Sequence, residues 1–279
     1  MARTNTERAR QSLVAAPPLV FLVVFFLAPA IIMALASLRY PGEFGALAPL
    51  VATKPGEEAG LTAENYRLFF SDSIYLEIFV KSFGIAALTT LLCLAGAYPL
   101  ALLMARSAKR RRDLMVLLCV LPFASNFLVR VYAWMIMLGP FELLFTPIAV
   151  ICALVYVHLP FMVLPLYTNL ERHDPLLLDA AQDLGANAWQ CFWRVTFRLS
   201  LPGVFAGSAL VFIPVLGVFA IPEILGGIGD WLVGNMIKEA FLGVRDWPFG
   251  SMLSIMLTLC VLAIAWVTAR LARLGGGRA

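Results

Sequence analysis

The sequence predicts an all-α integral membrane protein with six transmembrane helices. Hydrophobic residues make up 61% of the 279 positions and charged residues 14%, and the mean hydropathy is +0.88. Soluble domains are typically about 45–50% apolar and about 25% charged. This composition excludes an ordinary soluble enzyme, a disordered chain and a disulfide scaffold. The net charge of only +4 argues against a nucleic-acid-binding protein.

Six apolar runs reach the length of about 20 residues that a helix needs to cross a bilayer. The first run follows Arg3, Arg8 and Arg10, as in a signal peptide. It is longer than the about 7–15 residues of a signal-peptide core, so we expect an uncleaved first span. We therefore expect a six-span membrane domain over 15–271, with spans at 15–38, 78–105, 114–138, 147–169, 203–222 and 249–271.

The distribution of Lys and Arg predicts the orientation of these spans. Fourteen of the 21 basic residues lie on one set of flanks, and basic residues favour the cytoplasmic side. We expect both termini in the cytoplasm, as tails over 1–14 and 272–279. The opposite flanks carry 11 of the 17 acidic residues, and a negative outer mouth attracts cations. The alternative is that outer acids merely escape the positive-inside bias.

Two connections are long enough to have structure of their own. The outer loop, 39–77, ends in an aromatic patch. The inner loop, 170–202, begins with a cap and a proline, after which apolar residues recur at helical spacing. Gly185 should end this first helix because glycine tolerates the left-handed conformation. An amphipathic aromatic stretch follows, and we expect Pro202 to end it before the fifth span.

The strongest motif lies within this inner loop. Asp179, Ala180, Ala181 and Gly185, with an apolar–proline pair at Leu201–Pro202, resemble the EAA loop of ABC-importer permeases. Small alanines allow another surface to approach closely, and the glycine provides a sharp turn. In that family the loop couples the permease to a cytoplasmic ATPase. The acid here is Asp rather than the family's usual Glu.

The resemblance extends over most of the chain. The segments 121–134, 159–167, 219–227, 234–235 and 245–250 are similar to those of the first permease subunit of spermidine/putrescine-type importers. The chain departs from that pattern at 139–146, where the family usually has a longer outer segment.

The resemblance implies the type I ABC-importer permease fold in a bacterial inner membrane. It implies a second homologous permease subunit, two cytoplasmic ATPase subunits and a periplasmic substrate-binding protein as partners. It also implies that ATP and Mg are held by the ATPase, with no cofactor, metal or catalytic residue in this chain. A polyamine is the expected substrate, with an opine, ferric iron or another small solute as the alternative.

Three residues are candidates for the substrate pathway. Glu223 follows a proline at the outer end of the fifth predicted span, where an ionisable group is costly and commonly functional. Its carboxylate can pair with a substrate ammonium, although a solvated interfacial acid is the alternative. Tyr132 and Trp134 offer cation–π faces, although aromatic side chains at membrane interfaces more often serve as anchors.

Other functional classes are less consistent with the sequence. It has no GxxxxGK[ST] phosphate loop, so any ATP must be hydrolysed by another subunit. A secondary transporter would have more ionisable residues in its spans or repeat symmetry. An intramembrane enzyme would need a catalytic cluster such as HExxH or paired aspartates, which the sequence lacks.

Overall fold

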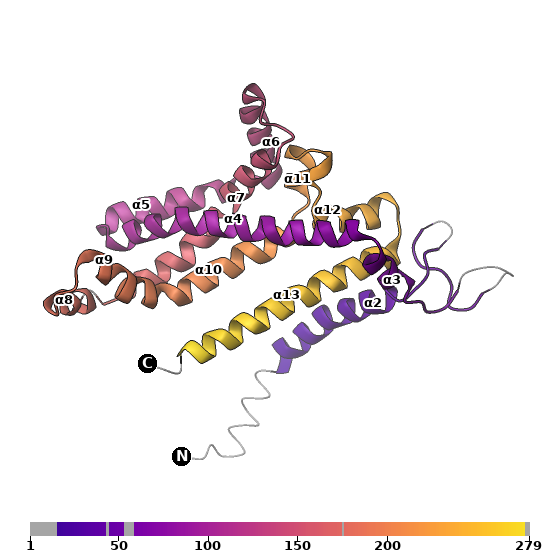
Figure 1. The fold of residues 1–279 in the computed structure, drawn as a ribbon, viewed down its shortest axis with the longest axis horizontal. Coiled ribbons are helices and arrows are strands. Elements are labelled where there is room, and N and C mark those ends of the chain that lie inside the picture. Colours follow the sequence, from indigo (N-terminus) through magenta and orange to yellow (C-terminus); the bar gives the residue numbers. More distant parts are fainter. Residues whose placement is uncertain (1–15, 43–44, 53–58, 175, 277–279) are drawn as a thin grey trace, which may run out of the picture. The chain divides into compact units, whose positions relative to one another are not determined.

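The computed structural model describes residues 16–42, 45–52, 59–174 and 176–276, and its regular structure is helical (Figure 1). Five of the described helices are long and apolar enough to cross a membrane, and a bent helix pair brings the number to six. The chain divides into two compact units. Unit 1 contains residues 1–75 and 236–279, and unit 2 contains residues 76–235.

Unit 1 is built on the first and last long helices of the chain. The first runs over Ala16–Ala36 and contains α2 (Ala28–Ala36), which packs along α13 (Trp247–Gly276) (Figure 1). The short helix α3 (Glu64–Ser71) lies in the predicted outer loop. The aromatic patch at the end of this loop has a packing partner, since the Tyr75 ring lies 5.2 Å from the Phe249 ring. The patch therefore packs on the start of α13.

Unit 2 is organised around the crossing of α7 (Pro147–Leu170) and α10 (Phe197–Gly217), its most extensive helix contact. Two glycines four residues apart allow the helices to approach closely. A Cβ added to Gly207 would lie 2.7 Å from the Met162 sulfur, and one added to Gly203 would lie 2.8 Å from the Asn169 Cβ. This is the small-xxx-small geometry that membrane helices use, because lipid tails provide no hydrophobic driving force between helices.

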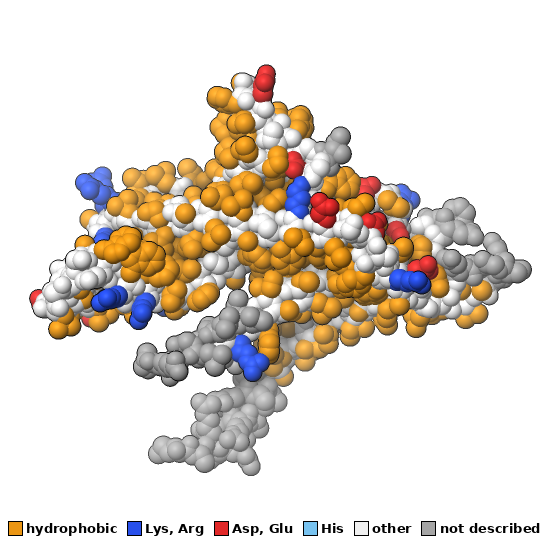
Figure 2. Space-filling model, in the orientation of Figure 1, with side chains coloured by type: hydrophobic (Ala, Val, Ile, Leu, Met, Phe, Trp, Pro, Cys, Tyr) orange, Lys and Arg blue, Asp and Glu red, His pale blue; other side chains and the backbone are white. Residues whose placement is uncertain are grey.

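Helix α4 (Ser73–Arg106) packs on α7 and α10 through small residues and polar contacts. Ala86, Cys93, Ala97 and Ala101 are fully buried along one face. The Tyr98 hydroxyl hydrogen-bonds to the Ser200 hydroxyl of α10 at 2.9 Å. Figure 2 shows hydrophobic side chains along much of the visible surface, as expected for helices that face lipid tails.

The third span differs from the sequence prediction. The run 114–138 is not one helix but two segments, Lys109–Ala124 and Phe127–Phe141, bent by 95°. A 3₁₀ turn at Leu121–Ala124 contains Pro122, which ends α5 (Lys109–Val120). The Asn126 side chain then accepts a hydrogen bond from the Leu128 N–H at 2.8 Å and starts α6 (Phe127–Leu138). A proline that ends one helix, followed by an N-cap that starts the next, changes the direction of the helix axis, although the run of apolar residues is continuous.

The fifth span also differs. The helix runs without a break over Ala188–Gly217, so the prediction that Pro202 ends a helix is wrong. Membrane helices tolerate proline because neighbouring hydroxyls and local π-helical adjustments satisfy the freed backbone groups. Here the residues Phe192–Thr196, shortly before Pro202, form a π-helix. The Ser200 hydroxyl donates to the Phe197 carbonyl, next to the Arg198 carbonyl that Pro202 leaves without an N–H donor. The predicted end at 222 is also wrong, because Ala220–Leu225 is a separate helix, α11.

The remaining span predictions agree with the structure to within a few residues. The run 15–38 corresponds to Ala16–Ala36 and 147–169 to Pro147–Leu170, while 78–105 lies within α4 and 249–271 within α13. The predicted outer loop 39–77 contains α3 and the first turn of α4. Helix α13 continues to Gly276, into the predicted C-terminal tail over 272–279. The predicted tail 1–14 lies outside the described residues.

Candidate functional site

The connection between α7 and α10 forms two short helices separated by a tight turn. Helix α8 spans Leu176–Asp183 and helix α9 spans Ala188–Cys191. Before α8, the Asp174 carboxylate accepts a hydrogen bond from the Leu176 N–H at 3.0 Å, which starts the helix. Pro175, expected to occupy the first turn, lies outside the described residues. The helix predicted at 176–184 is therefore present.

Gly185 ends α8 in the left-handed conformation, with φ = +83°. The Gly185 N–H donates to the Gln182 carbonyl at 2.8 Å, and the Ala186 N–H donates to the Ala181 carbonyl at 3.0 Å. This pair of hydrogen bonds is the Schellman motif, which favours glycine at this position. A Cβ at Gly185 would meet no atom within 4 Å, so the requirement for glycine is conformational and not steric.

Helix α9 is capped from its own sequence. The Asn187 side chain accepts from the Gln190 N–H at 2.9 Å, and the Gln190 side chain accepts from the Asn187 N–H at 3.1 Å. This reciprocal pair is a capping box. The predicted glycine break is thus followed at once by a new helix start, which fixes the direction of the chain as it enters α10.

The other residues of the motif are accessible on α8. Asp179 and Ala180 are exposed and Ala181 is half-buried. Leu176 and Leu184, at either end of α8, are 69% and 89% exposed. A short helix that presents small and apolar side chains outside the packed bundle has the character of a docking surface. We call residues 176–186 the docking loop.

An aromatic cluster joins the docking loop to the membrane helices. The Trp193 and Phe197 rings are 4.9 Å apart, and the Phe192 ring lies 5.6 Å from the Tyr98 ring of α4. The sequence predicts the aromatic residues at 189–197 as an amphipathic stretch. It gives no signal for Tyr98, which lies almost 100 positions earlier. Helices α9 and α10 belong to one continuous helix, Ala188–Gly217, which begins directly after the docking loop.

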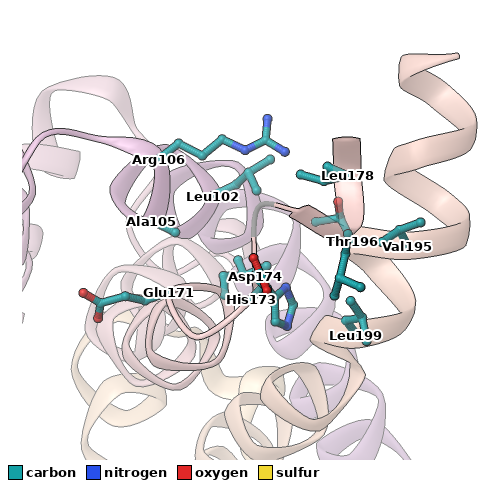
Figure 3. Close-up of a pocket in the computed structure, with 12 residues that line it drawn as sticks. Leu102, Ala105, Arg106, Glu171, His173, Asp174, Leu178, Val195, Thr196 and Leu199 are labelled. Carbon is teal, nitrogen blue, oxygen red and sulfur yellow. The ribbon is translucent and has the colours of Figure 1, made fainter. Parts of the chain in front are cut away.

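A pocket of about 460 Å³ lies beside the docking loop. Its walls come from the ends of α4 and α7, from α8, and from the start of α10 (Figure 3). Arg106, His173, Asp174 and Thr196 supply its polar groups, and Glu171 lies at its edge. The sequence predicts no such pocket.

The substrate-pathway candidates lie at α6 and α11, which contact each other. Glu223 is exposed in the first turn of α11. Tyr132 is 52% exposed, whereas the Trp134 ring packs at 5.6 Å against the Tyr156 ring of α7. Residues two positions apart on a helix point in different directions. Tyr132 and Trp134 therefore do not share one face of α6.

The segment from the end of α11 into α12 (Val233–Lys238) is held by contacts from distant parts of the chain. Lys81 of α4 pairs with Asp230 at 3.3 Å and also donates to the Gly229 carbonyl. The neighbouring Ser82 hydroxyl accepts from the Val233 N–H at 2.9 Å. A Cβ at Gly234 would lie only 2.5 Å from the Val218 carbonyl oxygen. We call residues 226–235 the clamped segment.

Arg130, a cation within the third predicted span, lies over the Phe123 ring at 5.6 Å. This cation–π contact crosses the bend between α5 and α6. Among the described residues, no group of three or more His, Cys, Asp or Glu side chains could hold a metal ion.

Comparisons with known proteins agree with this geometry. Residues 97–275 match the family described as binding-protein-dependent transport system inner membrane component. The chain is 40% identical over 230 residues to the spermidine/putrescine transport system permease protein PotB of Escherichia coli, a match that covers 75% of this chain and 83% of that protein. It is 41% identical over 224 residues to the PotB of Haemophilus influenzae, with 74% and 78% covered.

The fold has also been seen in a solved structure. A chain in the crystal structure of a bacterial alginate ABC transporter, in complex with an alginate pentasaccharide-bound periplasmic protein, matches with a TM-score of 0.73. The match covers 98% of both chains at 15% identity, so it establishes the fold alone. The chain thus has the six-span, all-α fold of type I ABC-importer permeases, and it belongs to the family of inner-membrane components of binding-protein-dependent transport systems.

Proposed function

We propose that this chain is the permease subunit of a polyamine importer and forms half of its translocation pathway. The observation that carries the proposal is the 40% identity over 230 residues to a spermidine/putrescine permease. The excess of acidic residues on the predicted outer flanks supports it, since polyamines are cations. An importer of an opine, ferric iron or another small solute is the alternative.

In this proposal the docking loop lies in the cytoplasm and inserts into an ATPase subunit. The distribution of basic residues supports a cytoplasmic position for the loop and both termini. A second permease, two ATPase subunits and a periplasmic binding protein complete the importer. ATP and Mg are bound by the ATPase, and this chain performs no covalent chemistry.

Coupling then depends on the rigidity of the connection from the docking loop to the membrane. ATP binding closes the ATPase dimer and moves the docking loop. The Schellman turn and the capping box fix the loop, and the continuous helix Ala188–Gly217 carries its motion across the bilayer. The hydrogen bond from Tyr98 to Ser200 makes α4 move together with this helix. The expected result is an outward opening of the cavity, which hydrolysis reverses.

Within the pathway, we assign the substrate contact to Glu223 of α11, together with Tyr132 of α6. Both side chains are exposed, and α6 and α11 touch. A carboxylate and an aromatic face are the two groups that recognise an alkylammonium ion. Trp134 is the weaker of the three candidates because its ring packs on Tyr156.

Uptake tests the proposal. The chain is expressed with its partner subunits and binding protein in cells that lack their own polyamine importers, and uptake of radiolabelled spermidine and putrescine is measured. We expect saturable uptake that requires ATP and the binding protein. Saturable uptake of another solute, with none of either polyamine, would retain the permease assignment and reject the substrate.

A further inference from the structure

We propose that the pocket beside the docking loop binds the headgroup of a zwitterionic phospholipid, with a phosphodiester and a primary ammonium group, as in phosphatidylethanolamine. The inference does not depend on the transported substrate. It rests on the position of the pocket, on its division into apolar and polar halves, and on charged groups that have no ionic partner in the described part of the chain.

The pocket lies where lipid headgroups lie. Arg106 is the last residue of α4 and Leu170 is the last residue of α7, so the pocket is at the ends of two membrane-crossing helices. Its volume of about 460 Å³ falls within the range of about 300–1,000 Å³ typical of ligand pockets. Basic pockets between membrane helices at this level bind lipid headgroups in other membrane proteins.

One half of the pocket is apolar and continuous with the membrane helices. Its side chains are aliphatic and come from α4, α7, α8 and the start of α10, namely Leu102, Leu170, Leu177, Leu178, Val195 and Leu199. Such a wall suits the glycerol backbone and first acyl carbons of a lipid, because it removes apolar surface from water. A free phosphate ion has no apolar surface for this wall to remove from water, so the wall favours a lipid over phosphate.

The other half offers donors for a phosphodiester. In Figure 3 the Arg106 side chain extends along one edge of the pocket, and the Thr196 hydroxyl and the His173 ring face its interior. Among the described residues, Arg106 has no carboxylate within salt-bridge distance. Guanidinium and hydroxyl groups form strong charge-assisted hydrogen bonds with phosphate oxygens.

The acidic groups favour a zwitterion over an anion. Asp174 lines the pocket beside His173 (Figure 3), and its Oδ1 caps α8 without forming an ion pair in the described part of the chain. Its carboxylate can receive the ammonium group of the lipid. Glu171 points away from the pocket (Figure 3) and already pairs with Arg112 at 2.6 Å. A purely anionic headgroup would leave Asp174 repelling it.

A bound headgroup would touch three parts of unit 2 at once. It would join the end of α4, the docking loop and the start of α10, which are the parts that must move together for coupling. The lipid would therefore stiffen the connection between the docking loop and the membrane helices.

The test measures lipid retention. The full-length chain, purified from bacterial membranes with its bound subunits, is analysed by native mass spectrometry and then exchanged into nanodiscs of phosphatidylethanolamine or of phosphatidylglycerol. We expect one tightly retained phosphatidylethanolamine, with about tenfold weaker retention in Arg106→Ala, since one charge-assisted hydrogen bond is lost. The matched control is Arg110→Ala, an exposed arginine on α5 outside the pocket, which should retain the lipid.

Two further variants test the identity of the ligand. Leu178→Trp fills the pocket without removing charge and should also expel the lipid, so the result does not depend on folding of the Arg106 variant. Asp174→Asn should weaken the preference for phosphatidylethanolamine over phosphatidylglycerol. Equal retention in Arg106→Ala and Arg110→Ala would overturn the site. Competition by soluble phosphate as effective as by the lipid would overturn the lipid assignment, as would a pocket found occupied by an ATPase side chain.

Discussion

The docking loop and the clamped segment are fixed by contacts of different reach along the chain. The docking loop is specified by residues a few positions apart: Asp174 caps one helix, Gly185 ends it and Asn187 starts the next. The clamped segment has local hydrogen bonds too, to the Asp230 and Asn235 side chains, but it is also held by Lys81 and Ser82, about 150 positions away in the chain. A loop that must keep its shape while it is displaced needs local restraints.

The largest effect is expected where the clamped segment depends on close backbone packing. Gly234→Ala would put a Cβ 2.5 Å from the Val218 carbonyl and 2.7 Å from that of Gly217. Because backbone atoms cannot move aside, we expect the free energy of unfolding to fall by about 3 kcal/mol. Thermal unfolding of the purified complex measures this effect.

A glycine in the same segment provides the control. A Cβ at Gly229 would meet no atom within 4 Å, so Gly229→Ala should leave the midpoint of unfolding unchanged. Equal losses in the two variants would mean that close packing does not hold this segment.

At Gly185 the effect should depend on backbone conformation and not on side-chain volume. Its φ of +83° strains any β-branched residue, at a cost of about 1–2 kcal/mol. Gly185→Val should therefore open the turn and abolish transport, while insertion into the membrane remains normal. Gly185→Asn should retain most of the activity, because asparagine tolerates the left-handed region. Transport assays on membranes that contain equal amounts of each variant measure this difference. Full activity in Gly185→Val would remove the docking-loop assignment.

For the pathway, Glu223→Gln should raise the apparent KM for polyamine uptake about tenfold, because one charge-assisted contact to an ammonium is lost. Glu77→Gln removes the same charge from an exposed position in the first turns of α4 and should leave KM unchanged. An identical KM change in both variants would indicate a general surface-charge effect instead of a contact at Glu223.

The smallest effects should come from two ion pairs, one in the clamped segment and one at the end of α7, before the docking loop. The side chains of Lys81 and Asp230 are 34% and 11% exposed, whereas those of Arg112 and Glu171 are 26% and 36% exposed. We expect a coupling energy of about 1 kcal/mol for the first pair and about 0.5 kcal/mol for the second. Double-mutant cycles at low and high salt measure both couplings. A stronger coupling for the Arg112–Glu171 pair would contradict the role of Lys81 in clamping.

The sequence was most informative where the structure is local. The turn at Gly185, the helix at 176–184 and four of the six spans follow from spacing and hydropathy, which act over a few residues. The bend after Pro122 was missed because a continuous apolar run outweighed one proline and the Asn126 cap. Pro202 was misinterpreted as a helix end because a membrane helix satisfies the freed backbone groups in ways that single-residue propensity does not include. The Tyr98–Ser200 and Lys81–Asp230 contacts join distant residues, for which one sequence carries no signal.

The central claim is that the docking loop connects this chain to an ATPase driven by a polyamine-loaded binding protein. The most direct measurement is the ATPase activity of the co-expressed complex in nanodiscs, with the binding protein added in the presence and absence of spermidine or putrescine. We predict stimulation that requires both the binding protein and a polyamine and that disappears in Gly185→Val. Failure of the chain to associate with any ATPase would contradict the claim.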